Sequence, residues 1–129
     1  LGAEGIQAGT LFALTEESSA SKEFKKRCTE LAEGDTMLCL KKIAPTRLIK
    51  NALYTKLAEA EDKGATADEL REILGRAASK RGIFEGDMES GELEIGQIAS
   101  AIKTIKPVSE VMKELISGFE KAKERVAFL

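Results

Sequence analysis

The fold of this chain depends on a short stretch near its start, which reads Gly5-Ile6-Gln7-Ala8-Gly9-Thr10-Leu11-Phe12. Glycines stand near the edges of this run and mostly apolar residues lie between them, so it predicts a brief buried strand that leaves through a Gly-Thr turn. A lone strand leaves backbone N–H and C=O groups unpaired on both of its edges. It therefore needs a partner, which could be Met37–Leu40, a second copy of the chain, or strands outside these 129 residues.

The rest of the sequence predicts a mostly α-helical chain. Apolar residues recur every three or four positions in several segments, and residues that favour helix ends flank these segments. One helix start is marked strongly, because Thr66 and Glu69 have the spacing of a capping box. The final helix is expected to use Ser109 as its N-cap. The expected helices are Lys22–Ala32, a segment from Pro45 to Lys63, Ala67–Leu74, Leu93–Ile105, and the last helix through Val126.

The composition argues against several classes of function. The chain has 20 Lys and Arg against 22 Asp and Glu, for a formal net charge of -2. It therefore lacks the basic excess that draws proteins to nucleic acids or anionic lipids. No apolar run approaches the roughly 20 residues that a membrane-spanning helix needs, and these residues contain no basic n-region followed by an apolar h-region. We expect a cytoplasmic protein that binds neither nucleic acid nor membrane.

The sequence contains no histidine, which removes the commonest general base and the commonest ligand of transition metals. Its two cysteines, Cys28 and Cys39, fit neither a disulfide framework nor a metal site, so we expect reduced, buried thiols. The acidic loop Glu85–Glu89 lacks the alternating ligands of a calcium-binding EF-hand loop. We therefore expect no metal site and no catalytic residue in this chain. Any chemistry must come from a cofactor, a carboxylate, a lysine, or residues of other polypeptide.

A candidate binding site lies in Gln7-Ala8-Gly9-Thr10. Gly9 lets the backbone approach a ligand closely, and successive N–H groups with a threonine hydroxyl can cradle an anion at the end of a strand. The same local pattern also fits an ordinary Gly-Thr turn without a ligand, which is the commoner case. A basic cluster could meet an acidic partner or a cofactor phosphate, or could be a solvated helix entrance. Its members are Lys41, Lys42, Arg47 and Lys50.

Four blocks of the sequence, in order, resemble the C-terminal part of one enzyme family. The run Leu1–Phe12 is similar to G-A-x-G-V-Q-M-G-T-R-F, and Asp35-Thr36 continues the likeness. Pro45–Asn51 is similar to a segment that ends in Arg, two hydrophobic residues, Arg or Lys, and Asn, and Gly86–Ala99 resembles G-D-x-x-x-G-S-x-M-A-G-Q-x-A. The family comprises FMN-dependent 2-nitropropane dioxygenases (nitronate monooxygenases) and enoyl-acyl-carrier-protein reductases II.

The resemblance implies a fold. Members of this family are (β/α)8 TIM barrels of about twice this length or more, so this α/β fold would be only partly contained in the chain. On that basis residues 1–14 would be the last barrel strand and its phosphate loop. Residues 22–81 would be a helical insertion, and residues 92–129 would be the closing helices. The chain would then be the C-terminal segment of one flavin-binding barrel domain.

The resemblance also implies a function. Gln7, Ala8, Gly9 and Thr10 match the residues that contact the FMN phosphate in the family, largely through backbone N–H groups. The protein would be part of an FMN-dependent oxidoreductase that oxidises a nitronate with FMN and O2. The alternative within the family is reduction of an enoyl thioester with NAD(P)H, and a homodimer is possible. Because the family's catalytic histidine lies upstream, this chain alone is expected to be inactive. A different alternative is a non-catalytic helical fragment or partner module.

Overall fold

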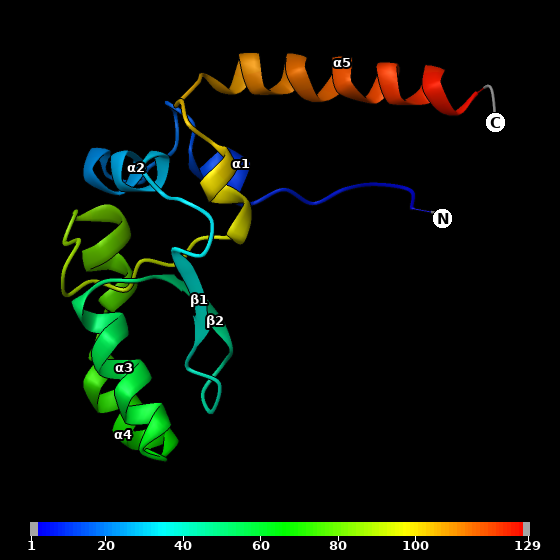
Figure 1. The fold of residues 1–129 in the computed structure, drawn as a ribbon. Coiled ribbons are helices and arrows are strands. Elements are labelled where there is room, and N and C mark those ends of the chain that lie inside the picture. Colours follow the sequence, from blue (N-terminus) through cyan, green and yellow to red (C-terminus); the bar gives the residue numbers. More distant parts are fainter. Residues whose placement is uncertain (1–2, 128–129) are drawn as a thin grey trace.

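The computed structural model describes residues 3–127, so the expectations for residues 1–2 and 128–129 lie outside it. Helices predominate in this range, and the two strands form a hairpin (Figure 1). The buried side chains form two hydrophobic cores. The elements are α1 (Thr10–Ala13), α2 (Lys22–Thr29), β1 (Thr36–Cys39), β2 (Thr46–Ile49), α3 (Ala52–Asp62), α4 (Ala67–Leu74), the π-helix η1 (Lys80–Phe84), the 3-10 helix η2 (Gln97–Ala101) and α5 (Val108–Val126).

The expected N-terminal strand over Gly5–Ala8 is wrong for this chain. Residues 3–8 have no regular secondary structure, and no segment within residues 3–127 pairs with them. The proposed partner Met37–Leu40 instead overlaps β1, which pairs with β2. A strand without a neighbour has no ladder of hydrogen bonds to define it. The segment passes at Gly9 into α1, a single turn in which the N–H of Ala13 donates to the Gly9 carbonyl oxygen at 2.9 Å.

The strand β2 corrects the expectation that Pro45 opens a helix. β1 and β2 are antiparallel, with Thr36 opposite Ile49. Leu48 and Ile49 are both buried, but Ile49 lies in the core beneath α2 and Leu48 lies in the core formed with α3 and α4. Successive side chains of a strand point to opposite faces, so β2 separates the two cores. The helix starts only after Asn51, whose Oδ1 accepts from the N–H of Tyr54 at 2.9 Å.

The expected helix over Leu93–Ile105 is also wrong, because only η2 within it is helical. Leu93 and Ile95 are buried while the residue between them is exposed, which is the alternation of a strand. The N–H of Ile49 donates to the Leu93 carbonyl oxygen at 3.0 Å, and the N–H of Ile95 donates to the Arg47 carbonyl oxygen at 3.2 Å. The edge of β2 that does not pair with β1 therefore holds this segment in an extended conformation.

Two other helices follow the sequence prediction, with small differences. The side chain of Ser21 caps α2, which ends at Thr29 rather than at Ala32. The capping box of α4 is confirmed: the N–H of Glu69 donates to the Thr66 hydroxyl, and the Thr66 N–H donates to the Glu69 carboxylate. Both starts depend on contacts between residues three apart, which is why the sequence alone predicts them.

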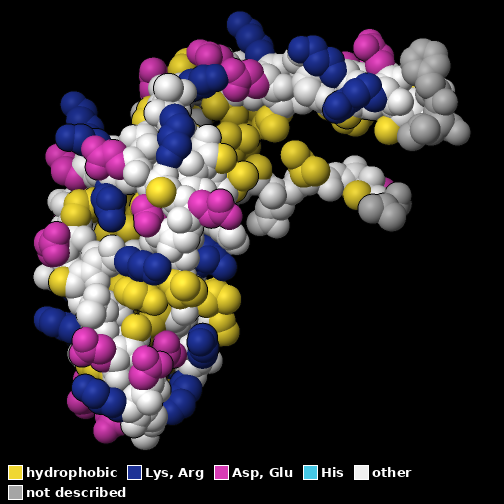
Figure 2. All heavy atoms as spheres, in the orientation of Figure 1, with side chains coloured by type: hydrophobic (Ala, Val, Ile, Leu, Met, Phe, Trp, Pro, Cys, Tyr) yellow, Lys and Arg dark blue, Asp and Glu magenta, His cyan; other side chains and the backbone are white. Residues whose placement is uncertain are grey.

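The last helix, α5, begins at Val108, so Ser109 is not its N-cap as expected. The carboxylate of Glu17 accepts from the Val108 N–H at 2.9 Å and takes over the capping role. The helix projects from the body of the molecule, and the N-terminal segment extends on the same side (Figure 1). Hydrophobic side chains gather between the two (Figure 2). No helix within residues 3–127 is both long enough and apolar enough to cross a membrane.

Candidate functional site

The predicted phosphate-binding segment, Gln7–Thr10, lies where the N-terminal segment enters α1. Gln7 and Gly9 are exposed, while Ala8 and Thr10 are half-buried. Within residues 3–127, the backbone N–H groups of these four residues donate to no protein acceptor. A Cβ added at Gly9 would meet no atom within 4 Å. The segment thus offers unengaged donors with open space beside them, as an anion-binding loop requires.

A second segment supports this loop at Gly96, which the sequence reasoning did not include among the site residues. The N–H of Gly96 donates to the Thr10 hydroxyl oxygen at 3.0 Å. A Cβ at Gly96 would stand 2.5 Å from that oxygen, so a larger residue would displace the threonine. Glycine is needed here for the close approach of two chain segments. The Gly-Gln pair in the fourth resembling block is the sequence signal that could have indicated this residue.

The third and fourth resembling blocks meet at Asn51. Its Nδ2 donates to the carbonyl oxygens of Met88, at 3.0 Å, and Gly91, at 2.9 Å. The second block joins the third, because the N–H of Lys50 donates to the Asp35 carbonyl oxygen at 3.1 Å. Lys50 and Asn51 therefore connect the second, third and fourth blocks to one another in the fold.

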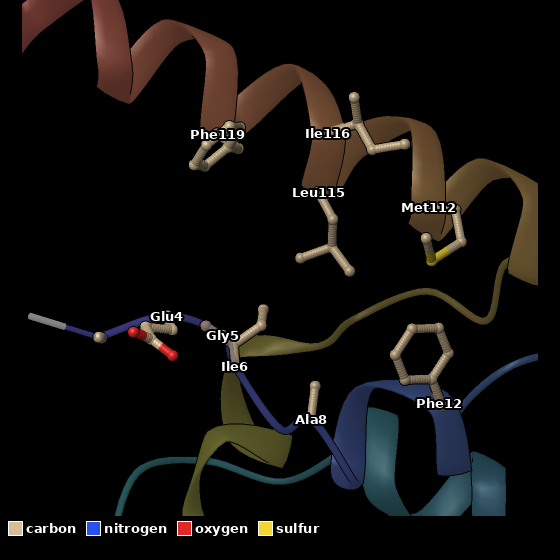
Figure 3. A pocket seen from close by; sticks show the side chains of 10 residues that line it. Glu4, Gly5, Ile6, Ala8, Phe12, Met112, Leu115, Ile116 and Phe119 are labelled. Carbon is tan, nitrogen blue, oxygen red and sulfur yellow. The ribbon is translucent and has the colours of Figure 1, made fainter.

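An apolar cavity of about 500 Å³ lies between the N-terminal segment and α5. Leu115 and Met112 point from the helix toward Ile6 and Phe12 across the open space (Figure 3). Phe119 also lines the cavity, and this residue is 63% exposed. Ala8 belongs to the candidate phosphate loop and also lines the cavity, so the cavity lies next to the loop. Its lining suits aliphatic or aromatic groups rather than an anion.

Two members of the basic cluster expected from the sequence, Lys42 and Arg47, bind backbone carbonyl groups of the fold. Lys42 Nζ donates to the carbonyl oxygens of Gly64 and Ala65, at 2.9 and 2.6 Å. Arg47 lies on β2 and its guanidinium donates to the Thr36 carbonyl oxygen at 3.2 Å. Within residues 3–127, no group of three or more cysteine, aspartate or glutamate side chains is arranged to hold a metal ion.

Both cysteines are buried free thiols, as predicted. Burial raises the pKa of Cys28 from its ordinary 9.0 to about 12. Burial, aided by the hydrogen bond from Cys39 Sγ to the Glu61 carboxylate, raises the pKa of Cys39 to about 11. A thiol reacts as its thiolate, so neither cysteine is suited to be a nucleophile at neutral pH.

We expect both thiols to resist alkylation in the folded chain. At pH 8 iodoacetamide should modify them at least roughly 100-fold more slowly than in urea, because the thiolate fraction falls tenfold per unit of pKa. Mass spectrometry of timed samples measures this ratio. Because both folded-state pKa values are raised, the thiols' contribution to stability is full below pH 9 and is lost as the pH rises toward about 11 to 12. Equal modification rates in the two states would contradict the assignment.

Comparisons with known proteins agree on one family. The chain matches the family model described as nitronate monooxygenase over residues 1–118. A probable nitronate monooxygenase of Staphylococcus saprophyticus is 33% identical over 86 residues, which make up 64% of this chain and 24% of that protein. The structure of FabK from Thermotoga maritima is similar with a TM-score of 0.86 and 28% identity, over 98% of this chain and 40% of that one.

A methionine-to-alanine mutant of the same FabK gives a TM-score of 0.79 and 25% identity, over 98% of this chain and 37% of that one. The chain therefore spans about a quarter of the curated relative and about two fifths of the similar structures.

Proposed function

Because the chain belongs to the nitronate monooxygenase family of FMN-dependent oxidoreductases, we propose that it forms part of the FMN site of such an enzyme. The observation that carries this proposal is the family match over residues 1–118, which includes the whole loop Gln7–Thr10 and its support at Gly96. The reaction that we favour is oxidation of a nitronate with FMN and O2.

The residues of the loop fit a phosphate group. Its backbone N–H groups would hold the FMN phosphate, and their donors are unengaged in the described part of the chain. The Gly96 N–H keeps the Thr10 hydroxyl oxygen in a fixed place, so the hydroxyl hydrogen stays free to point toward an anion. A backbone donor depends little on its side chain, so Ala8 can occupy a position where the family usually has methionine. FMN, when bound, supplies the electron transfer.

This chain contributes binding rather than acid–base chemistry. It contains no histidine, and its thiols have pKa values too high for a nucleophile. We therefore infer that it is inactive by itself and that the catalytic base of the enzyme lies on other polypeptide. The substrate-selecting residues are expected there as well, so reduction of an enoyl thioester with NAD(P)H is the second candidate. The similarity to FabK over 98% of this chain keeps this candidate open.

The apolar cavity fits the same proposal. Met112, Ile116 and Phe119 are between 41% and 63% exposed, although they form one apolar stripe of α5. In a complete (β/α)8 barrel the remaining polypeptide would cover this stripe and supply sheet neighbours for residues 5–8. A homodimer that uses the stripe is the other arrangement that would cover it.

The test uses the gene product that contains these 129 residues. We expect it to purify with FMN and to consume oxygen with propane-2-nitronate as substrate. Thr10→Val removes the acceptor of the Gly96 N–H and the hydroxyl beside the phosphate loop, so it should weaken FMN binding by about tenfold or more. Flavin fluorescence, which changes on binding, measures the dissociation constant.

The matched control is Ser117→Ala, which removes a hydroxyl group from an exposed position of α5 and should leave FMN affinity unchanged. Oxidation of NAD(P)H with crotonyl thioester, without oxygen uptake on the nitronate, would select the enoyl reductase instead. A gene product without any bound flavin or flavin-dependent activity would leave the non-catalytic module as the better description.

A further inference from the structure

A second cleft, of about 490 Å³, lies beside α2 on a different part of the surface. It shares no lining residue with the loop Gln7–Thr10 or with the apolar cavity next to α5. Side chains of α2 form one wall, and residues before α2 and after η2 form the rest. The polar residues that line it are Glu16, Lys22, Lys25, Lys26, Thr29 and Lys103.

Four lysines line this cleft, and no carboxylate of the described residues lies within 4.0 Å of their ammonium groups. In the described range, Lys80, Lys106 and Lys123 each lie within 4.0 Å of a glutamate carboxylate, while most other lysines, such as Lys56 and Lys121, make no ion pair. Within residues 3–127, Lys22, Lys25, Lys26 and Lys103 make no such ion pair, and Glu16 is the one acidic residue among the cleft's lining. A local excess of positive charge is notable in a chain whose net charge is -2.

Two of the four ammonium groups are held in place by the backbone. Lys25 is only 8% exposed, and its Nζ donates to the carbonyl oxygens of Glu16, at 3.2 Å, and Ser18, at 2.8 Å. Since an ammonium group has three N–H donors, one donor of Lys25 is left. Lys103 Nζ donates to the Leu31 carbonyl oxygen. Groups that are already ordered cost less entropy when a ligand binds.

We propose that this lysine cleft binds a compact polyanion, such as a diphosphate or a tricarboxylate. An anion there would be attracted by positively charged side chains on two sides of the cleft. Lysine binds phosphate and carboxylate oxygens as a point charge, without the planar geometry that arginine imposes. The volume falls in the range of small-molecule sites, and the chain's net negative charge disfavours a nucleic acid as the ligand.

The experiment titrates the 129-residue chain, without FMN, with pyrophosphate and separately with citrate. Calorimetry gives the affinity, and two-dimensional NMR spectra of the backbone amides locate the bound ion. We expect one saturable site with shifts in α2 and around Lys103. The double variant Lys22→Gln/Lys26→Gln should weaken binding by about tenfold or more, while its unchanged amide spectrum elsewhere shows that it is folded.

The control double variant is Lys56→Gln/Lys121→Gln, which removes the same charge from exposed positions on α3 and α5. Its affinity should stay within about twofold of the starting chain, because neither lysine lines the cleft and solvent screens exposed charges outside it. Saturable binding of either pyrophosphate or citrate at this cleft supports the proposal. The ion that binds more tightly identifies the anion class. Absence of saturation, or an equal loss in the two double variants, would overturn it. Since the amide shifts distinguish α2 and Lys103 from the loop Gln7–Thr10, failure of this proposal is distinguishable from failure of the proposed flavin site.

Discussion

Replacing Gly91 by alanine is expected to destabilise the fold by about 3 kcal/mol or more. A Cβ at this position would lie 2.5 Å from the Gly82 nitrogen, and the Gly82 Cα and the Asp87 carbonyl oxygen would be closer still. These are backbone atoms, so a rotamer change cannot relieve the clash. The segment before Leu93 would have to move away from η1, and the hydrogen bond from Asn51 to the Gly91 carbonyl oxygen would move with it.

Urea unfolding followed by circular dichroism measures this loss. Gly118→Ala is the matched control, because a Cβ at Gly118 meets no atom within 4 Å and the residue lies inside α5. Alanine is the better helix former, so the control should leave stability unchanged or raise it by about 0.5 to 1 kcal/mol. Similar unfolding midpoints for the two variants would show that Gly82 and Gly91 are not in close contact.

The second large effect is expected at Asn51, whose side chain connects α3 to the loop before Leu93. Asn51→Ala should cost about 3 kcal/mol, from one lost N-cap and two lost hydrogen bonds of about 1 kcal/mol each. Asn51→Asp retains a cap acceptor for the Tyr54 N–H, but it turns the donor toward Met88 and Gly91 into an acceptor. This variant should therefore lose most of the stability that the bonds to Met88 and Gly91 provide, while it keeps the N-cap of α3.

Ser21→Ala provides the comparison for a cap alone. The Ser21 hydroxyl accepts from the Phe24 N–H, and its removal should cost about 1 kcal/mol. Thermal unfolding of all three variants gives the order of stability, with Ser21→Ala highest and Asn51→Ala lowest. If Asn51→Asp were as stable as the unaltered chain, the two bonds from Nδ2 would contribute nothing.

The sequence predicts this fold best where the determining contacts are local. The start of α2 at Ser21 and the capping box of α4 involve residues three apart, so their pattern can be read without a structure. Pro45 and Leu93–Ile105 were misread for the opposite reason. Their conformations depend on hydrogen bonds between β2 and residues 93–95, which lie more than forty positions apart in the chain. Apolar spacing alone does not separate a helix from a strand in such short segments.

The candidate site was only partly predictable. The loop Gln7–Thr10 was identified by its resemblance to a family motif, and its role in binding FMN stays a prediction. The strand expected before it depends on neighbours that residues 3–127 do not provide. Gly96 was missed because its importance lies in the space that a side chain would fill, which a sequence pattern does not show. The N-terminal cap of α5 was missed for a different reason, because Glu17 lies 91 positions from Val108 in the chain.

The bond from Gly96 to Thr10 spans 86 positions of the chain. Such a closure carries a large entropic cost until the intervening segments are ordered, and contacts of this kind form late in folding. During synthesis the loop would leave the ribosome before Gly96, and it would acquire its geometry only after Gly96 has followed. A substitution that slows the folding of the residues between Thr10 and Gly96 would then reduce the yield of correctly folded protein, even if every residue of the loop were unchanged.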